Sequence, residues 1–287
     1  MFYKLCIINN VLNNFVFSLL ILFFVLSNGC KLPHTFNPLT ATRLRSIELE
    51  HLGNTALERG DNKTAEKYFS DALRLNRRDV DLRRSYAESL WQQGKNTDAI
   101  EQLKYAQKHG GGQNDVNLNI SLAEKLLCMN NIDDAYKQAD EAVRLSPQDS
   151  RGWALRGKAS MMYVQNQLNS PVMKMDITNV KPEDIKNIDQ VKEKIRERII
   201  NSRNDYYRAI SMDPSNRNIL ADLAEIQLLA GQPEHSLITL QNLQEQYPPE
   251  SIPSHILQCK AKVYFALKKY DEANQCIAIA NEKIKRK

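Results

Sequence analysis

Turn-forming and cross-linking residues are scarce in this chain of 287 residues, which contains 10 Gly, 10 Pro and 5 Cys. The cysteines form no CxxC pair or other framework, so the sequence does not predict a disulfide scaffold, although Cys259 and Cys276 could pair after export. The net charge of +5 is small and dispersed, which argues against a nucleic-acid partner. The abundance of Ala, Leu, Glu and Lys predicts helices.

Catalytic and metal-binding motifs are absent from the sequence. None of the five histidines, which are His34, His51, His109, His235 and His255, forms an HExxH motif or pairs with a cysteine at metal-ligand spacing. The chain has no P-loop, no GxSxG and no GxGxxG motif. The sequence therefore predicts no catalytic residues, no metal site and no cofactor, with an enzyme of unrecognised site as an alternative.

One strongly apolar run stands near the N-terminus, within the stretch FVFSLLILFFVLSNGCKLP. Its core from Phe15 to Leu26 is shorter than the roughly 20 residues that a membrane-spanning helix needs. Small residues precede Cys30, as in bacterial lipoprotein signals, in which the thiol receives a diacylglycerol group. Ser27 departs from that pattern, because an aliphatic residue is usual there. We expect residues 1–29 to be a signal peptide or membrane anchor. The first expectation is a lipoprotein signal with lipidation at Cys30, and the alternatives are a cleaved signal without a lipid and an uncleaved anchor.

The position of the cationic residues favours a different arrangement. Lys4 is the one charged residue before the run, whereas Lys31, Arg43 and Arg45 follow it. If the run were an uncleaved anchor, the positive-inside rule would place the rest of the chain in the cytosol. Residues 30–45 contain Pro33 and Pro38, and we expect them to form a tether.

The remaining sequence repeats with a period of 34 residues. Gly53 and Ala87 are 34 positions apart, as are Ala65 and Ala99, and Ala72 and Ala106. Small residues recur where helices must approach closely, and a fixed period in this range indicates a solenoid.

The spacing and the order of aromatic, Gly, Ala and Pro positions resemble the tetratricopeptide repeat (TPR). This resemblance implies an all-α, right-handed solenoid of antiparallel helix pairs over residues 46–287. Six repeats are expected, at 46–79, 80–113, 116–149, 150–216, 217–250 and 254–287.

The fourth repeat contains a long insertion. Gly157 and Pro214 are 57 residues apart, whereas the equivalent Ala224 and Pro248 are 24 apart, a difference of 57 − 24 = 33 residues. We expect the insertion at about residues 163–190, with a second helix lengthened backwards from Met212 to about Pro182 or Ile188. It is either a tolerated surface insertion or a docking element.

The TPR resemblance also implies a working surface on the concave face, built from the first helix of each repeat. The residues predicted to line this groove are Asn54, Arg84, Glu88, Trp91, Glu124, Arg151, Lys158, Lys262 and Phe265. Apolar patches are expected at Trp91, Met161, Leu228 and Phe265, whereas Cys128 is expected to be a buried small apolar residue.

The combined prediction is a non-enzymatic scaffold or adaptor that binds a peptide or helix of a protein partner in its groove. The chain resembles bacterial TPR lipoproteins that assist assembly in the cell envelope. Its N-terminus would attach it to a membrane, facing the periplasm or exterior. The alternative is a cytosol-facing TPR receptor on an uncleaved anchor.

Overall fold

The computed structural model describes residues 38–170, 182–248 and 251–285. The expected signal or anchor, Cys30 and the first part of the expected tether lie outside these ranges. The described residues form twelve α-helices and one short 3-10 helix, with no strand. None of these helices is both long and apolar enough to cross a bilayer.

Consecutive helices pack as six antiparallel pairs within the described ranges. The pairs are α2 (Pro38–Glu58) with α3 (Asn62–Leu75), α4 (Val80–Trp91) with α5 (Asn96–His109), α6 (Val116–Cys128) with α7 (Ile132–Leu145), α8 (Ser150–Leu168) with α9 (Pro182–Met212), α10 (Arg217–Leu229) with α11 (Pro233–Glu245), and α12 (Ser254–Ala266) with α13 (Tyr270–Lys285).

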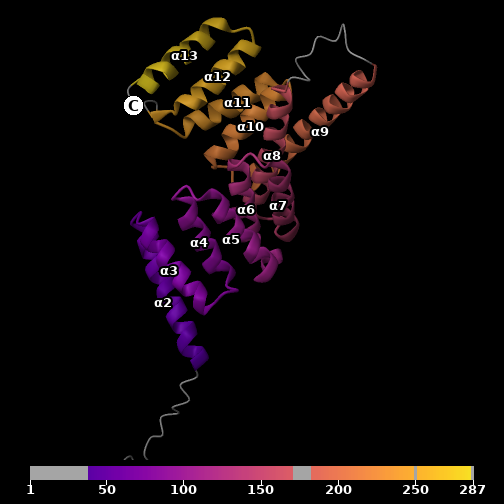
Figure 1. Cartoon of the computed structure of the whole chain (residues 1–287). Coiled ribbons are helices and arrows are strands. Elements are labelled where there is room, and N and C mark those ends of the chain that lie inside the picture. The colour runs from indigo at the N-terminus through magenta and orange to yellow at the C-terminus, as the bar shows by residue number, and fades with distance from the viewer. Residues whose placement is uncertain (1–37, 171–181, 249–250, 286–287) are drawn as a thin grey trace, which may run out of the picture.

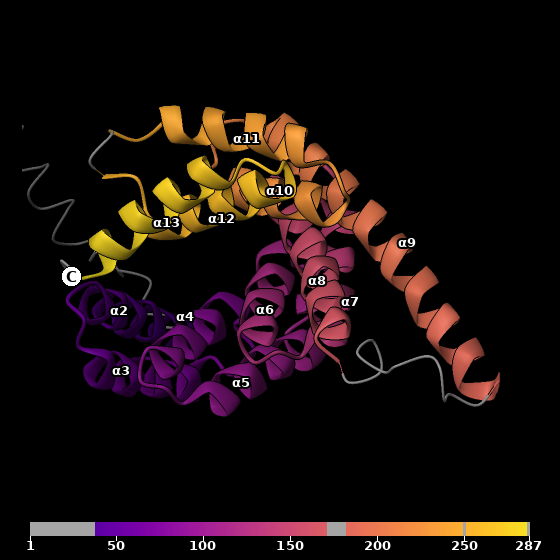
Figure 2. The same ribbon diagram turned by 90° about the horizontal axis from the view of Figure 1, so that it is seen from above.

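The pairs stack into a curved solenoid (Figure 1). The first helices of the pairs, α2, α4, α6, α8, α10 and α12, contact one another in sequence and form the inner row. Helices α3, α5, α7, α9 and α11 lie on the outside of the curve, and the view from above shows the solenoid as an open arc (Figure 2). The inner row therefore forms the concave face that the sequence predicts.

A left-handed residue closes the turn inside five of the six pairs. Gly60, Gly94 and Gly231 have φ between 72° and 76°, and Asn130 and Lys268 have φ of 56° and 60°. In each turn the left-handed residue and its successor donate backbone hydrogen bonds to the preceding helix, which satisfies its last carbonyl groups. In the fourth pair, α8 and α9 are separated by residues 169–181, of which the structure describes only Asn169 and Ser170.

Asp and Asn side chains start four helices of the inner row. Asp79, Asp115, Asp149 and Asn216 accept hydrogen bonds from backbone N–H groups in the first turns of α4, α6, α8 and α10. These contacts satisfy donors that have no partner inside the helix. These four inner helices therefore begin with capped N-termini.

Small residues allow the helices to approach closely. The alanines that recur with the 34-residue period, Ala65, Ala72, Ala99 and Ala106, are fully buried. In the first pair the ring of Phe69 packs where a side chain on Gly53 would stand, 2.6 Å from an ideal Cβ. The core is therefore a continuous strip between the two rows.

The fourth pair has an unusually close junction. A Cβ on Gly157 would lie 3.3 Å from both the Ser202 carbonyl oxygen and the Tyr206 ring, and Ser202 Oγ donates to the Gly157 carbonyl oxygen at 2.8 Å. Beside this contact, Arg156 donates two hydrogen bonds to Asp205, of 2.9 Å and 2.7 Å. These contacts hold the middle of α8 against the C-terminal half of α9.

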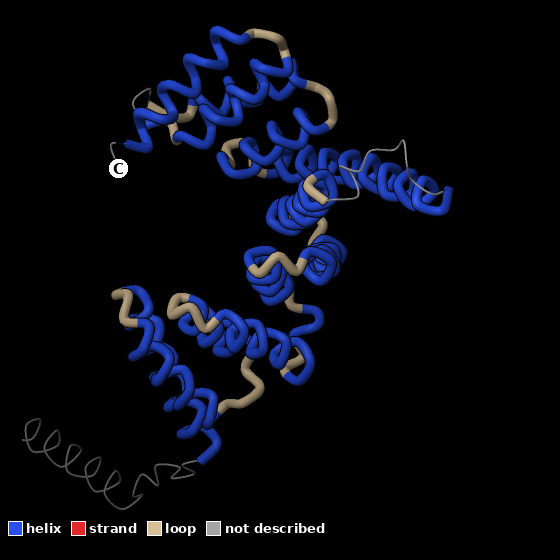
Figure 3. The backbone as a smooth tube through the Cα atoms, turned by 45° about the horizontal axis from the view of Figure 1, so that its top comes forward, coloured by secondary structure: helices blue, strands red, loops and turns tan. Residues whose placement is uncertain are grey.

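The part of α9 that is N-terminal to this junction projects away from the solenoid (Figure 3). It contains 31 residues, whereas α11, the equivalent helix of the next pair, contains 13. The helix begins at Pro182, the earlier of the two starts that the sequence allows. Both flanks of the expected insertion are thus helical, since α8 continues to Leu168.

The expected tether extends too far toward the C-terminus. Helix α2 begins at Pro38, so residues 38–45 of the expected 30–45 tether are helical. Proline is compatible with the first turn of a helix, because the N–H that it lacks would have no partner there. Pro38 therefore marks a helix start and not an extended segment.

Candidate functional site

The nine predicted groove residues lie on the inner row and differ in their exposure to solvent. Glu124, Arg151, Lys158, Lys262 and Phe265 are exposed, and Asn54, Arg84, Glu88 and Trp91 are half-buried. They come from α2, α4, α6, α8 and α12 in turn, so the inner row spreads them along the arc. The structure groups only some of them into local contacts.

A charged cluster joins α4 to α6. Lys125 Nζ donates to Glu88 Oε2 at 2.7 Å and lies 4.9 Å from the centre of the Trp91 ring. The Lys125 side chain is only 10% exposed, whereas that of Glu88 is 37% exposed, so the ion pair is shielded from water mainly on the lysine side. Trp91 also packs against the central core cluster. This residue therefore supports the fold as well as contributing surface to the groove.

The two predicted groove arginines are engaged by neighbouring groups. Arg84 Nη2 lies 2.8 Å from Asp81 Oδ1. Arg151 Nη2 donates to Asp149 Oδ2 at 2.6 Å and to Asn117 Oδ1 at 2.9 Å. Each guanidinium group thus has an acceptor at Nη2, whereas Arg84 Nη1 is buried without a hydrogen-bond partner. Because their paired or buried atoms are less accessible, these arginines offer less to a partner than the sequence suggests.

Glu124 and Phe265 remain accessible at separate points of the inner row. Burial raises the pKa of Glu124, and nearby Glu88 adds to this rise, whereas Lys125 and Arg151 oppose it. Phe265 is 42% exposed and faces Tyr270 with ring centres 6.2 Å apart. These residues supply an acidic group and an apolar group for contact with a partner.

Two residues depart from their predicted positions. Met161 is buried in a cluster with Tyr206, Leu223 and Ile226, so it does not form a groove patch. Cys128 is exposed, contrary to the expected burial, because it ends α6 at the turn into α7.

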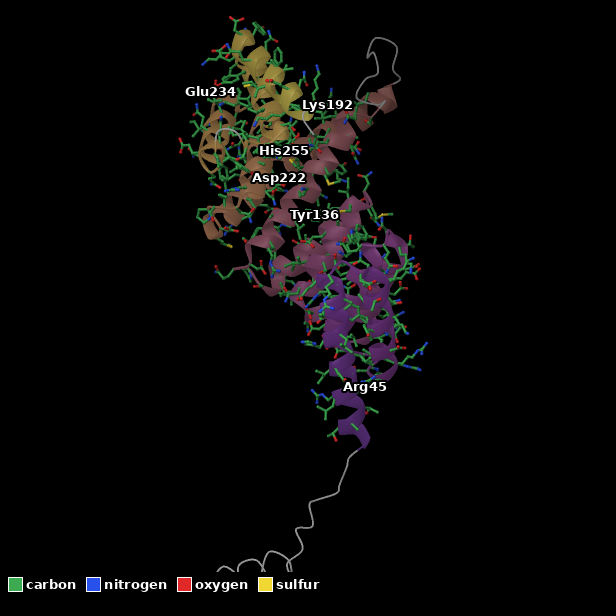
Figure 4. All side chains as sticks on the ribbon, turned by 90° about the vertical axis from the view of Figure 1, so that its left-hand side faces the viewer. Arg45, Tyr136, Lys192, Asp222, Glu234 and His255 are labelled. Carbon is green, nitrogen blue, oxygen red and sulfur yellow. The ribbon has the colours of Figure 1, made fainter. Side chains whose placement is uncertain are left out.

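A hollow of about 490 Å³ opens on the inner face between α8, α10 and α12. It combines the predicted Lys158 and Lys262 with carboxylates, an imidazole and a thiol. In Figure 4, Asp222 and His255 lie close together on α10 and α12. We call this the inner-face hollow; its lining is Lys158, Asn218, Ala221, Asp222, Glu225, Leu240, His255, Ile256, Gln258, Cys259 and Lys262.

Asp222 is the most unusual group in the inner-face hollow. Burial raises the pKa of its carboxyl group, although Lys158, Tyr206 and His255 act in the opposite direction. Lys158 Nζ lies 3.5 Å from Asp222 Oδ2, which is longer than a typical charge-assisted hydrogen bond. The Tyr206 hydroxyl is fully buried beside Asp222, in a contact that is looser than a well-formed hydrogen bond.

Sequence reasoning did not single out Asp222, His255 or Tyr206. Asp222 lies three residues before Glu225 on α10, so helical spacing was a usable signal for it. Tyr206 lies on α9 of the outer row, and no sequence signal places it against α10.

The cysteines of the last pair are free thiols, as is Cys128. Burial and the nearby Glu225 raise the pKa of Cys259 to about 11, so its thiol stays protonated at neutral pH. A thiol in this state is a poor nucleophile and a poor metal ligand. Cys259 therefore acts as part of the wall of the inner-face hollow.

Replacing Asp222 with Asn should stabilise the protein at neutral pH. A carboxyl group with a raised folded-state pKa contributes stability at low pH and loses it as the pH rises through that folded-state value. The stability advantage of Asp222→Asn should therefore grow as the pH rises above the ordinary value of 3.8, then level off. Thermal unfolding followed by circular dichroism over a pH series measures this; a constant difference at all pH values would contradict it.

Comparison with known proteins identifies the architecture. Residues 51–114 match the family model of the tetratricopeptide repeat. PilF of Pseudomonas aeruginosa superimposes with a TM-score of 0.60 over 82% of this chain and 90% of that chain, at 13% identity. This chain has the fold of a TPR solenoid.

Two further TPR-solenoid comparisons have similar scores. PilW, described as a widely conserved type IV pilus biogenesis factor, gives a TM-score of 0.61 over 80% of this chain and 90% of that chain, at 16% identity. A structure of IFIT1 with m7Gppp-AAAA also gives 0.61, at 16% identity, over 83% of this chain and 49% of that chain. At these identities the likeness concerns the fold alone. A sequence comparison with proteins of curated function gives no match.

Proposed function

We propose that this TPR solenoid is a non-enzymatic scaffold or adaptor that binds an extended or helical segment of a protein partner along its inner row. The supporting observation is an open, continuous face of mixed character, with accessible charge at Glu124 and Lys262 and an exposed aromatic ring at Phe265. Such a surface suits the alternating side chains of a peptide segment.

The proposal includes a membrane tether at the N-terminus. A diacylglycerol group on Cys30 would hold the solenoid at the envelope, where two acyl chains give stable attachment. The similarity in fold to PilF and PilW is compatible with a role in assembling an envelope complex. An uncleaved anchor, with the solenoid in the cytosol, is the alternative arrangement.

Photo-crosslinking in native cells tests the groove. A benzoylphenylalanine at Glu124, on the inner row, should give one discrete protein adduct, because the partner lies along this face. The same group at the exposed Lys137 on outer helix α7 is the matched control and should give none. Adducts of equal yield at both positions, or no adduct at Glu124, would refute groove binding.

The same membrane extract reports on the tether through the intact mass of the protein. The proposal predicts a chain that begins at Cys30 and carries acyl mass. A mass that corresponds to a start at Met1 would instead support the uncleaved anchor and a cytosolic groove.

A further inference from the structure

The inner-face hollow leaves charged groups incompletely paired, in contrast to the cluster between α4 and α6. At the α4–α6 cluster, Lys125 and Glu88 form a 2.7 Å ion pair, whereas the Lys158–Asp222 distance is 3.5 Å. The Lys158 side chain is 45% exposed, so water competes with Asp222 for its ammonium group. Asp222 is thus a largely buried carboxylate whose cationic neighbour is loosely held.

The floor of the inner-face hollow is acidic and has unused hydrogen-bonding capacity. Asp222 and Glu225 lie three residues apart on α10, on the same face of the helix. Glu225 Oε1 accepts one hydrogen bond from Gln165 Nε2, at 3.0 Å. The Tyr206 hydroxyl is fully buried beside Asp222, in a contact looser than a well-formed hydrogen bond. Asp222 is therefore an incompletely satisfied acceptor, and an added donor would relieve its desolvation cost.

The rim of the inner-face hollow has the opposite charge. Lys262 is exposed on α12, and it has no ion-pair or hydrogen-bond partner among the described residues. Lys158 stands on the other side, on α8. A ligand that enters therefore meets cationic groups at the entrance and carboxylates at the floor.

We infer that the inner-face hollow binds a lysine or arginine side chain of the partner, with an acidic residue beside it in the partner sequence. The inference rests on the proposed groove function. The aliphatic stem of the basic residue lies along Ala221 and Ile256, and its head donates to Asp222 and Glu225. The Tyr206 hydroxyl donates to Asp222 from below, and the acidic neighbour contacts Lys262. The volume of about 490 Å³ accommodates one long side chain and its backbone.

A phage-displayed library of random linear peptides, selected on the full chain in detergent, tests this inference. The selected peptides should share a Lys or Arg with an adjacent Asp or Glu. Binding of a selected peptide should weaken about tenfold or more in the Asp222→Asn, Glu225→Gln variant, because charge-assisted hydrogen bonds are lost. Glu245→Gln, an exposed position on outer helix α11, is the matched control and should bind normally.

The outcomes separate the inference from the function on which it rests. Selected peptides without a basic residue, or with one that is insensitive to the Asp222 and Glu225 changes, would overturn the inference and leave groove binding intact. If no peptide is selected, the proposed function fails and the inference fails with it. Because Asp222→Asn alone should be stabilising, weaker binding by that single variant cannot be explained by unfolding, and circular dichroism verifies that the double variant is folded. Lys262→Ala should remove the preference for the acidic neighbour while the basic residue is retained.

Discussion

Replacing Asp205 with Ala should lower the free energy of unfolding by about 3–5 kcal/mol. Its carboxylate is only 6% exposed and receives two hydrogen bonds from Arg156, whose side chain is 18% exposed. The substitution leaves a largely buried guanidinium without its main acceptor, and that uncompensated charge is the source of the cost. Denaturant unfolding followed by circular dichroism gives the measurement.

The same guanidinium group supplies the control. Arg156 Nη1 also donates to Asp140 Oδ1 at 2.6 Å, but the Asp140 side chain is 55% exposed. Water can replace this contact, so Asp140→Ala should cost less than about 1 kcal/mol. Equal losses in the two variants would show that the protein does not shield the Arg156–Asp205 pair from solvent.

Replacing Phe69 with Ala should cost about 3–5 kcal/mol, since it removes a fully buried ring and leaves a cavity between α2 and α3. The loss should be local to one end of the solenoid. Each helix pair contacts mainly its neighbours, so stability is close to a sum of local terms. The first pair should therefore open while the last pairs stay folded.

Hydrogen exchange measured by segment tests this locality. Amides of α2 and α3 should lose protection in Phe69→Ala, and amides of α10 to α13 should keep it. Leu75→Ala, at an exposed position of α3, is the matched control and should change exchange little. A uniform loss of protection along the whole chain would mean that the solenoid unfolds as one cooperative unit.

The fold was predictable because the repeat period is encoded in small residues that must be buried. Ala65 and Ala99 are 34 positions apart and both are fully buried, as the period requires. The turns were only partly predictable. Gly60 and Gly94 are typical left-handed residues, whereas Lys268 adopts the same conformation without being a glycine. The helix start at Pro38 was missed because proline is both a helix breaker and a frequent first helical residue.

The sequence allowed the face that carries the candidate site to be predicted, but not how deeply each side chain on that face is buried. The TPR resemblance implies that Lys158 and Lys262 lie on the inner row, and both line the inner-face hollow. It cannot reveal that residues of α9 and α10 cover Met161. Nor can it place Tyr206 beside Asp222, because that contact depends on how α9 packs against α10 and not on spacing within either helix.

The outward course of α9 has a practical consequence for labelling the protein. At about 1.5 Å per residue this helix is roughly 46 Å long, and its first turns stand away from the inner row (Figure 2). A fluorophore or affinity handle attached at Lys192 or Glu193 would therefore be carried outside the arc. Such a handle would allow the solenoid to be immobilised or followed in cells while its concave face stays open to a partner.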